Sequence, residues 1–255
     1  MIRSESEGHV VRLVIDRPQR RNALSFEMIR ALATALAAVD ADASCQCVVI
    51  EGAGDNFCSG RELAPGDGNR SLEQVLAYDD AYGEIFQRLN ALTKPSLAVV
   101  RGYAVAGGFT LAMACDFVIA DESARFGALE MKNGFPAAIN TAVLSRGLGR
   151  RRALELLLFG NTVSATELFG LGLVNRLASD ADELRQIAAD WTARLGALDA
   201  TAVRLTKETY RAVAGLPLAD ALTVGKQLNA LLLASGRIDE AAAAFAERRN
   251  RHAVS

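Results

Sequence analysis

Up to about Asn140, short and almost continuously apolar runs alternate with segments whose apolar residues recur at helical spacing. A strand with one solvated face alternates apolar and polar residues, whereas a strand covered on both faces reads as an unbroken apolar run. The pattern therefore predicts an α/β fold in which helices cover both faces of the strands. The predicted strands are Val10–Ile15, Cys47–Ile50, Ser96–Val100 and Phe117–Ala120.

The helical segments begin with residues that cap helix N-termini. Ser25 precedes a segment, starting at Phe26, in which apolar residues recur every three or four positions. Ser71 and Gln74 have the spacing of a capping box, in which each side chain bonds the other residue's N–H. This box predicts the start of a long helix that runs to about Leu92, before Pro95 interrupts it.

From about Asn140 onward the pattern becomes almost wholly helical, with a second capping box predicted at Ser164 and Glu167. The composition shifts near residue 196. We therefore predict a mixed core over residues 1–195 and a helical region over residues 196–255 that does not fold alone. The remaining predicted helices span residues 111–115, 180–196, 199–213, 217–234 and 236–250.

The composition argues against several classes of function. The chain has 255 residues, and its 28 Lys and Arg against 30 Asp and Glu give a charge of −2, unlike a nucleic-acid-binding protein. Its two histidines lie near the termini and its four cysteines form no CxxC pair, so no metal site is expected. We see neither a signal peptide nor a membrane-spanning run, and we expect a cytoplasmic protein with reduced cysteines.

Two glycine-containing turns, over residues 52–63 and 101–116, each follow a predicted buried strand. Glycine lets the backbone approach a ligand closely, and the first turn of a helix leaves its N–H groups unpaired. Two such N–H groups that converge from different turns would form an oxyanion hole. The alternative is that these glycines only permit tight turns and close helix packing. The residues alone leave both readings open.

Neither turn matches a nucleotide-binding loop or the GxSxG turn of a serine hydrolase. Cys58 and Ser59 are candidate nucleophiles, but no histidine lies in the middle of the chain to act as their base. Nucleophilic catalysis is therefore disfavoured.

Glu130 is the strongest candidate for acid–base chemistry. Its neighbours Leu129 and Met131 are apolar, and a carboxylate in an apolar setting has a raised pKa, which suits a general acid or base near neutral pH. The alternative is a solvent-facing glutamate that pairs with Lys132 or Arg125.

Six segments resemble, in order and spacing, the motifs of the crotonase superfamily, also called the enoyl-CoA hydratase/isomerase family. Together they are specific for the family, though not for one of its reactions. The matching segments are Asp16–Leu24, Phe57–Leu63, Gly102–Asp116, Ala124–Glu130, Ala165–Val174 and Phe245–Arg249.

The resemblance implies a crotonase-like spiral of ββα units with a C-terminal helical region for trimerisation, so we expect a homotrimer or a dimer of trimers. It implies an acyl-CoA substrate and no cofactor, since coenzyme A is part of the substrate. The thioester oxygen would lie between the backbone N–H groups of Arg61 and Gly107. Glu130 matches the second of the two glutamates that hydratases of the family use.

The departures from the family pattern bear on the reaction. Thr110 stands where hydratases have their first glutamate, and a single retained glutamate resembles the family's Δ3,Δ2-enoyl-CoA isomerases. Ala106 replaces the first glycine of the usual GGG, and Leu129 replaces a proline. Thr110, Ala106 and Gly108 are assigned to the substrate pocket. The alternatives are hydration, with the Thr110 hydroxyl holding the water, and a non-catalytic acyl-CoA-binding protein.

Candidate contacts to coenzyme A follow from the same motifs. Arg21 and Arg248 are candidates for binding its phosphates, because arginine pairs well with phosphate oxygens. Phe245 is a candidate for flanking the adenine. Ala23 and Ser59, each in a matched motif, complete the predicted contacts. Glu62, in contrast, is expected to be structural.

Overall fold

Strands and helices alternate, as predicted, through residue 127, and the elements that follow are mostly helical. The computed structural model describes residues 1–62, 71–236 and 238. In chain order the elements are β1 (Ile2–Glu7), β2 (Val10–Ile15), η1 (Pro18–Arg20), α1 (Phe26–Ala41), β3 (Cys47–Gly52), α2 (Leu72–Ala91), β4 (Ser96–Val100), β5 (Tyr103–Val105), α3 (Gly107–Ala114), β6 (Phe117–Asp121), β7 (Arg125–Gly127), η3 (Glu130–Asn133), α4 (Ala138–Gly147), α5 (Arg150–Phe159), β8 (Val163–Ser164), α6 (Ala165–Gly170), β9 (Arg176–Ala178), α7 (Ala181–Gly196), α8 (Ala200–Val213) and α9 (Leu218–Ala234).

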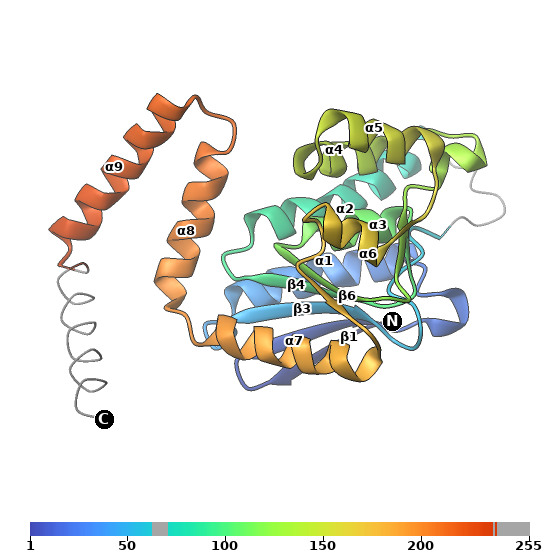
Figure 1. Ribbon diagram of the computed structural model, residues 1–255, viewed down its shortest axis with the longest axis horizontal. Helices are drawn as coiled ribbons and strands as arrows, with labels where there is room; N and C mark the ends of the chain where they lie inside the picture. The colour runs from blue at the N-terminus through green and yellow to red at the C-terminus, as the bar shows by residue number, and fades with distance from the viewer. Residues whose placement is uncertain (63–70, 237, 239–255) are drawn as a thin grey trace. The chain divides into compact units, whose positions relative to one another are not determined.

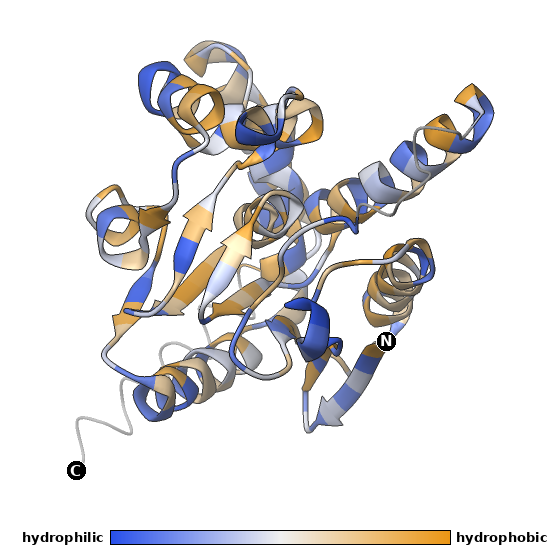
Figure 2. Ribbon diagram, turned by 90° about the vertical axis from the view of Figure 1, so that its right-hand side faces the viewer, coloured by the Kyte–Doolittle hydropathy of each residue, from blue (hydrophilic) through white to orange (hydrophobic). Residues whose placement is uncertain are grey.

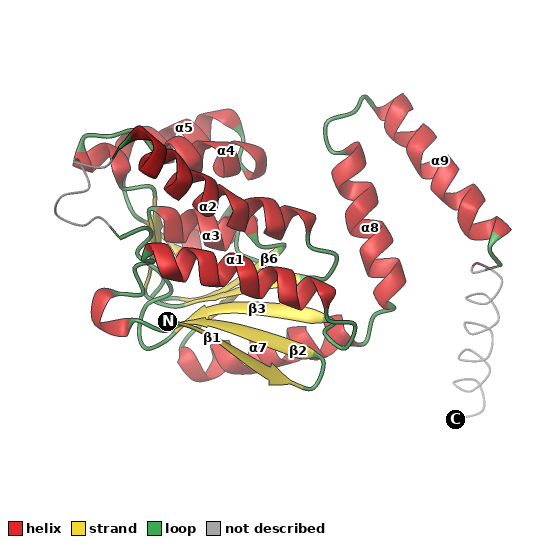
Figure 3. Ribbon diagram, turned by 180° about the vertical axis from the view of Figure 1, so that it is seen from behind, coloured by secondary structure: helices red, strands yellow, loops and turns green. Residues whose placement is uncertain are grey.

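The main sheet has six strands in the order β1-β2-β3-β4-β6-β9, and only the β1–β2 pair is antiparallel. Helices α1, α2 and α3 cover one face of this sheet, and α7 covers the other (Figures 1 and 3). A smaller sheet joins β5, β7 and β8. The predicted α/β class, with strands covered on both faces, is therefore confirmed.

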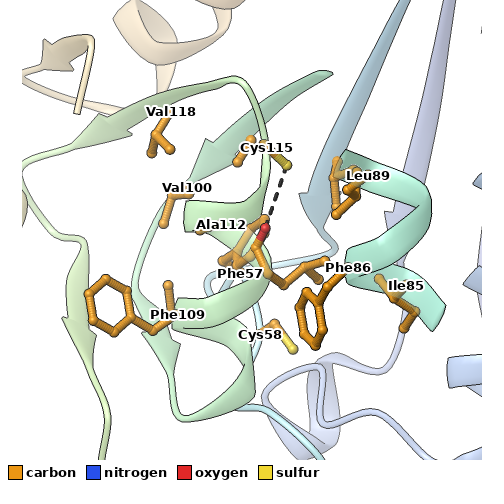
Figure 4. Close-up of a cluster of buried hydrophobic side chains, with 14 of the residues drawn as sticks. Phe57, Cys58, Ile85, Phe86, Leu89, Val100, Phe109, Ala112, Cys115 and Val118 are labelled. Atoms are coloured by element: carbon orange, nitrogen blue, oxygen red, sulfur yellow. Dashed lines mark hydrogen bonds between the residues drawn. The ribbon is translucent and has the colours of Figure 1, made fainter. Parts of the chain in front are cut away.

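Alternate residues of the central strands enter two separate cores, which explains why their sequences are apolar throughout. In β3, Val48 and Ile50 belong to the larger core, whereas Val49 belongs to the smaller core on the side of α7. Figure 4 shows part of the larger core, in which Cys58 lies with Phe57 and Phe86. The smaller core consists of Val49, Leu97, Val99, Ile119, Ala178, Leu184 and Ala188.

Two of the three predicted caps form as expected. Ser25 accepts from an N–H of α1, and Ser71 and Gln74 form both bonds of the capping box at the start of α2. Ser164 accepts from the Glu167 N–H at 3.1 Å, but the Glu167 carboxylate bonds Arg152 rather than returning to Ser164. The second capping box is thus only half formed, because a nearby arginine competes for its carboxylate.

The structure differs from the sequence-based expectations in several places, which include the unpredicted short strands β5 and β7. β1 was not predicted, because it is a largely hydrophilic edge strand without an apolar run (Figure 2). Helix α3 begins at Gly107 rather than at Leu111, so Gly107 and Gly108 lie in its first turn. The region after Asn140 is not wholly helical, since it contains the short strands β8 and β9.

The chain separates into two compact units, Met1–Ala200 and Thr201–Ser255. The predicted boundary after residue 195 falls inside the last turn of α7. Helices α8 and α9 contain no buried residue. The helix predicted over residues 236–250 lies almost wholly outside the described residues, and trimerisation stays a prediction. No helix in the described ranges is both long and apolar enough to cross a membrane.

Candidate active site

A cavity of about 270 Å³ lies between the two glycine turns, helix α2 and the segment that carries Glu130. We call the main chain of residues 59–61 and 105–107 the glycine wall, and residues 129–140 the carboxylate wall. Helix α2 contributes Asp79 and Tyr82. The cavity is lined by Ser59, Arg61, Asp79, Tyr82, Val105, Ala106, Gly107, Leu129, Glu130, Asn133, Phe135, Pro136, Ala137, Ala138, Ile139 and Asn140.

A buried amide holds the first glycine turn in place. Asn22 has no exposed surface, and its Nδ2 donates to the carbonyls of Ala53 at 2.9 Å and Asn56 at 2.6 Å. Its Oδ1 accepts from the Arg17 N–H at 2.9 Å. The Arg17 guanidinium in turn forms two bonds with the Glu62 carboxylate, at 2.7 and 2.9 Å. Glu62 therefore anchors the turn and does not line the cavity.

Two main-chain N–H groups of the glycine wall have no acceptor in the part of the chain that the structure describes. The Leu24 N–H donates to the Gly60 carbonyl, and the Glu62 N–H donates to the Leu24 carbonyl, so this bridge leaves out the Arg61 N–H. Gly107 is the first residue of α3, where an N–H has no acceptor within the helix. Within the described part of the chain, neither N–H donates to another residue. Arg61 and Gly107, the predicted oxyanion pair, therefore line one cavity with their donors unused.

The glycines of this region exclude side chains by close contact. A Cβ on Gly60 would lie 2.7 Å from the Gly107 nitrogen, and one on Gly107 would lie 1.8 Å from the Tyr82 hydroxyl oxygen. A Cβ on Gly108 would lie 2.0 Å from the Cys58 carbonyl oxygen. Gly108 thus allows α3 to pack on Cys58, and it does not line the cavity as the sequence analysis had assigned it.

Ala106 occupies the glycine position of the family motif and keeps a glycine-like backbone. Its φ of 50° and ψ of −127° lie in a region that L-residues rarely adopt. Its N–H donates to the Gly127 carbonyl at 2.7 Å, which fixes the entry into α3. Ala106 lines the cavity, as predicted for a pocket residue.

Glu130 begins the short 3₁₀ helix η3 and is only 9% exposed. The Asn140 Nδ2 donates to its Oε1 at 2.7 Å, whereas its Oε2 has no hydrogen-bond partner among the described residues. Burial raises the pKa of Glu130, and the bonds from its own N–H and from Asn140 partly oppose this shift. The alternative of a solvent-facing glutamate paired with Lys132 or Arg125 is therefore wrong.

Thr110 does not face the cavity, in contrast to its predicted place in the pocket. It is fully buried in α3, and its hydroxyl donates to the Oδ1 of Asn140. That bond fixes the orientation of the Asn140 amide, so that the NH₂ group faces Glu130. Thr110, at the position of the family's first glutamate, thus helps to hold Glu130 through Asn140. The Thr110 hydroxyl is not placed to hold a water in the cavity.

The side chain of Arg61 is held away from its own N–H by two contacts with α2. Its guanidinium pairs with Asp79 at 2.5 Å and lies 4.8 Å from the centre of the Tyr78 ring. Asp79, the second acidic residue that lines the cavity, is therefore engaged by a cation. Arg61 lines the cavity, and neither of these side-chain contacts involves its N–H.

The predicted contacts to coenzyme A are only partly described. Ser59 lines the cavity, and its N–H donates to the Arg21 carbonyl at 3.0 Å, so the two residues are adjacent. The exposed Arg21 guanidinium lies 5.3 Å from the centre of the Tyr103 ring. Ala23 is half-buried and bonds main-chain atoms of its own turn. Phe245 and Arg248 lie outside the described residues.

Sequence reasoning did not identify Asn140, Asp79 or Tyr82. Each lies on a helix whose apolar periodicity gives no sign of a cavity, and their partners are distant in sequence. Cys58 is excluded as a nucleophile, because burial raises the pKa of its thiol to about 12. No cluster of three or more potential metal-binding side chains occurs in the described ranges.

Comparison with known proteins agrees with these motifs. A family model described as enoyl-CoA hydratase/isomerase matches residues 5–253. A Thermus thermophilus protein named as an enoyl-CoA hydratase is 39% identical over 252 residues, which cover 95% of this chain and 96% of the relative. The 2,3-dehydroadipyl-CoA hydratase of Escherichia coli is 32% identical over 246 residues, covering 95% and 94%. The crystal structure of an enoyl-CoA hydratase from Polaromonas sp. JS666 superimposes with a TM-score of 0.90 at 32% identity, covering 97% of each chain.

Proposed function

Because this chain belongs to the enoyl-CoA hydratase/isomerase family, we propose that it moves a carbon–carbon double bond in an acyl-CoA thioester, from the 3,4 to the 2,3 position. The observation that carries the proposal is the state of Glu130. Of the two acidic residues that line the cavity, Asp79 is paired with Arg61, and only Glu130 has a buried oxygen without a partner. One carboxylate suffices for a proton shuttle.

In the proposed reaction the thioester oxygen accepts hydrogen bonds from the Arg61 and Gly107 N–H groups. The Glu130 carboxylate takes a proton from C2, and the electrons of that C–H bond form a dienolate whose charge rests on the thioester oxygen. Glu130 then returns the proton to C4, and the double bond is left between C2 and C3. Each N–H donor at such a site typically contributes about 3–4 kcal/mol to the barrier reduction.

The raised pKa of Glu130 supports both halves of this shuttle. A base with an ordinary glutamate pKa would take a carbon-bound proton weakly, whereas burial raises the pKa of Glu130 and so makes its carboxylate a stronger base. Asn140 keeps one oxygen occupied, so the proton is carried by the other. No cofactor enters this scheme, and coenzyme A acts as part of the substrate.

Hydration of a 2-enoyl-CoA is the second candidate, and it is favoured by the names of the relatives. Hydratases of the family place a water between two carboxylates, and position 110 of this chain holds a threonine that is engaged by Asn140. The structure offers no unpaired second carboxylate among its described cavity residues. Hydration would therefore depend on Glu130 alone.

Separate incubations with a 3-enoyl-CoA and a 2-enoyl-CoA, followed by product analysis, distinguish the two reactions. We expect conversion of the 3-enoyl-CoA to the 2-enoyl-CoA, with little 3-hydroxyacyl-CoA from either. Formation of 3-hydroxyacyl-CoA at the rate of a two-glutamate hydratase, measured side by side, would overturn the isomerase proposal.

A further inference from the structure

The hydroxyl of Tyr82 is a buried polar group that has no partner among the described residues. Tyr82 lies on α2, lines the cavity and is only 4% exposed, and its ring packs edge-on against Phe86 with centroids 4.9 Å apart. Its oxygen has no hydrogen-bond partner in the described part of the chain. Native proteins rarely leave a buried hydroxyl unpaired, because its lost hydration is not replaced. Phenylalanine would fill the same space without this cost.

The hydroxyl lies directly beside the glycine wall. A Cβ on Gly107 would lie 1.8 Å from the Tyr82 oxygen and 3.5 Å from the Gly60 Cα. Since a bond from Cα to carbon is about 1.5 Å long, the oxygen lies within about 3.4 Å of the Gly107 Cα. The hydroxyl is therefore next to the residue whose N–H is one of the two unused donors, and close to the turn that supplies the other.

Neither Glu130 nor Cys58 forms a hydrogen bond with the Tyr82 hydroxyl. The Oε2 of Glu130 is itself unpaired, so the two groups are not bonded to each other. The Cys58 sulfur accepts from the Gly60 N–H at 3.3 Å. Burial, with smaller effects of Cys58 and Glu130, raises the pKa of Tyr82 well above its ordinary value, so the hydroxyl keeps its proton. The Tyr82 hydroxyl is therefore a hydrogen-bond donor without an acceptor among the described residues.

We propose that Tyr82 is a third donor of the oxyanion hole, whose hydroxyl binds the thioester oxygen of the acyl-CoA beside the N–H groups of Arg61 and Gly107. The inference rests on the proposed function, and it adds a catalytic side chain to a site otherwise made of main-chain donors. No proton is transferred from Tyr82. Because the bond strengthens as charge develops on the oxygen, its loss should lower kcat more than it raises KM.

The variant Tyr82→Phe removes only the hydroxyl, and Tyr78→Phe is its matched control. Tyr78 lies one helical turn earlier on α2, is 5% exposed, and does not line the cavity. The probe is butanoyl-CoA labelled with ¹³C at its thioester carbonyl, a saturated ester that binds without turnover. The infrared carbonyl stretch of the bound ester measures the strength of the hydrogen bonds to its oxygen.

We expect the stretch to shift to lower frequency on binding to the wild type and to Tyr78→Phe, and to shift less on binding to Tyr82→Phe. The kcat for the 3-enoyl-CoA should fall about tenfold or more in Tyr82→Phe, with KM nearly unchanged. The stability of Tyr82→Phe should equal or exceed that of the wild type, because an unpaired buried polar atom is removed. A purely structural role predicts the reverse pattern, with lower stability and an unchanged stretch.

Two outcomes would overturn the inference, and they are distinguishable. A wild-type shift that Tyr82→Phe fully retains removes Tyr82 from the oxyanion hole but leaves the proposed function intact. No shift in the wild type removes the hole itself, and the proposed function with it. Should Tyr82→Phe fold poorly, Tyr82→3-fluorotyrosine keeps the shape and makes the hydroxyl a stronger donor. It should then increase the shift, and an unchanged shift would count against Tyr82.

Discussion

The glycine wall and the carboxylate wall face the same cavity with different parts of the chain. The glycine wall presents main-chain N–H groups, and its contacts leave no room for a Cβ on Gly60 or Gly107. The carboxylate wall presents side chains, with Glu130 held by Asn140. The position of the backbone therefore decides the function of the glycine wall, whereas the identity of the side chains decides that of the carboxylate wall.

The largest effect is expected on the carboxylate wall. Glu130→Gln keeps the shape of the side chain but cannot accept a proton, so kcat for the 3-enoyl-CoA should fall about 10³-fold. The affinity for butanoyl-CoA, measured by calorimetry, should stay within about twofold of the wild type, because the glycine wall is untouched. Full activity of this variant would remove Glu130 from the mechanism.

Next in size is a change of backbone position on the glycine wall. In Gly107→Ala the new Cβ would overlap the Tyr82 hydroxyl, so either the helix start or Tyr82 must move. We expect kcat to fall about 10²-fold, as when a donor of an oxyanion hole is lost. Gly83→Ala is the control, since its Cβ meets nothing within 4 Å in α2. Helix propensity predicts that this control is stabilised by about 0.5–1 kcal/mol.

A smaller effect is expected when the hydrogen bond that lowers the pKa of Glu130 is removed. Asn140 favours the ionised form of Glu130, so Asn140→Ala should raise the pKa of that carboxyl further. The base must be ionised to take a proton, and the acidic limb of kcat/KM should therefore move to higher pH. On this acidic limb we expect Asn140→Ala to be slower than the wild type, and the difference should shrink as the pH rises.

Asn133→Ala serves as the comparison for the preceding variant. Asn133 lines the same cavity, but its amide bonds the Leu129 carbonyl rather than Glu130. The acidic limb of kcat/KM for Asn133→Ala should coincide with that of the wild type. An equal shift in both variants would show that Asn140 acts through general packing.

The conformation of Ala106 predicts a change in stability. Its positive φ is strained for an L-residue, and Ala106→Gly should raise the free energy of unfolding by about 1 kcal/mol. Denaturant titration measures this difference. A loss of stability would show that the methyl group contributes more by packing than the backbone strain costs.

The smallest effect is expected at Arg61, where a role of the main chain and a role of the side chain predict opposite results. If the glycine wall acts through its main chain, Arg61→Met should keep kcat within about threefold of the wild type, because the N–H remains. Loss of the pair with Asp79 should show mainly in stability, by about 1 kcal/mol or less. A hundredfold loss of kcat would assign the chemistry to the guanidinium.

Much of the frame followed from the sequence, because buried parallel strands and capped helices have local signals. The strands β3, β4 and β6 and the starts of α1 and α2 are of this kind. The apolar neighbours of Glu130 left open whether it is buried or faces solvent, and the structure shows it buried. The hydrophilic edge strand β1 and the two- or three-residue strands β5, β7 and β8 gave no periodic signal long enough to read.

The missed parts of the site depend on contacts that no local pattern reveals. Asn140 bonds Thr110, which lies thirty residues earlier in the chain. Tyr82 contacts Gly107, and β4 and β5 lie between these two residues in the sequence. Thr110 was assigned to the pocket because it stands where hydratases of the family have their first glutamate. It is buried instead, since helix α3 begins four residues earlier than predicted and turns this side chain toward α4.

The main-chain character of the glycine wall has a consequence for reading natural or random variants of this protein. Only proline removes a main-chain N–H, so other inactivating changes at Gly60, Gly107 or Gly108 must distort the backbone and should also reduce soluble yield. Inactive proteins that are produced in normal amounts should instead carry their changes at Tyr82 or between residues 129 and 140. Yield and activity, scored together across a library, would therefore sort damaged variants by the side of the cavity they affect.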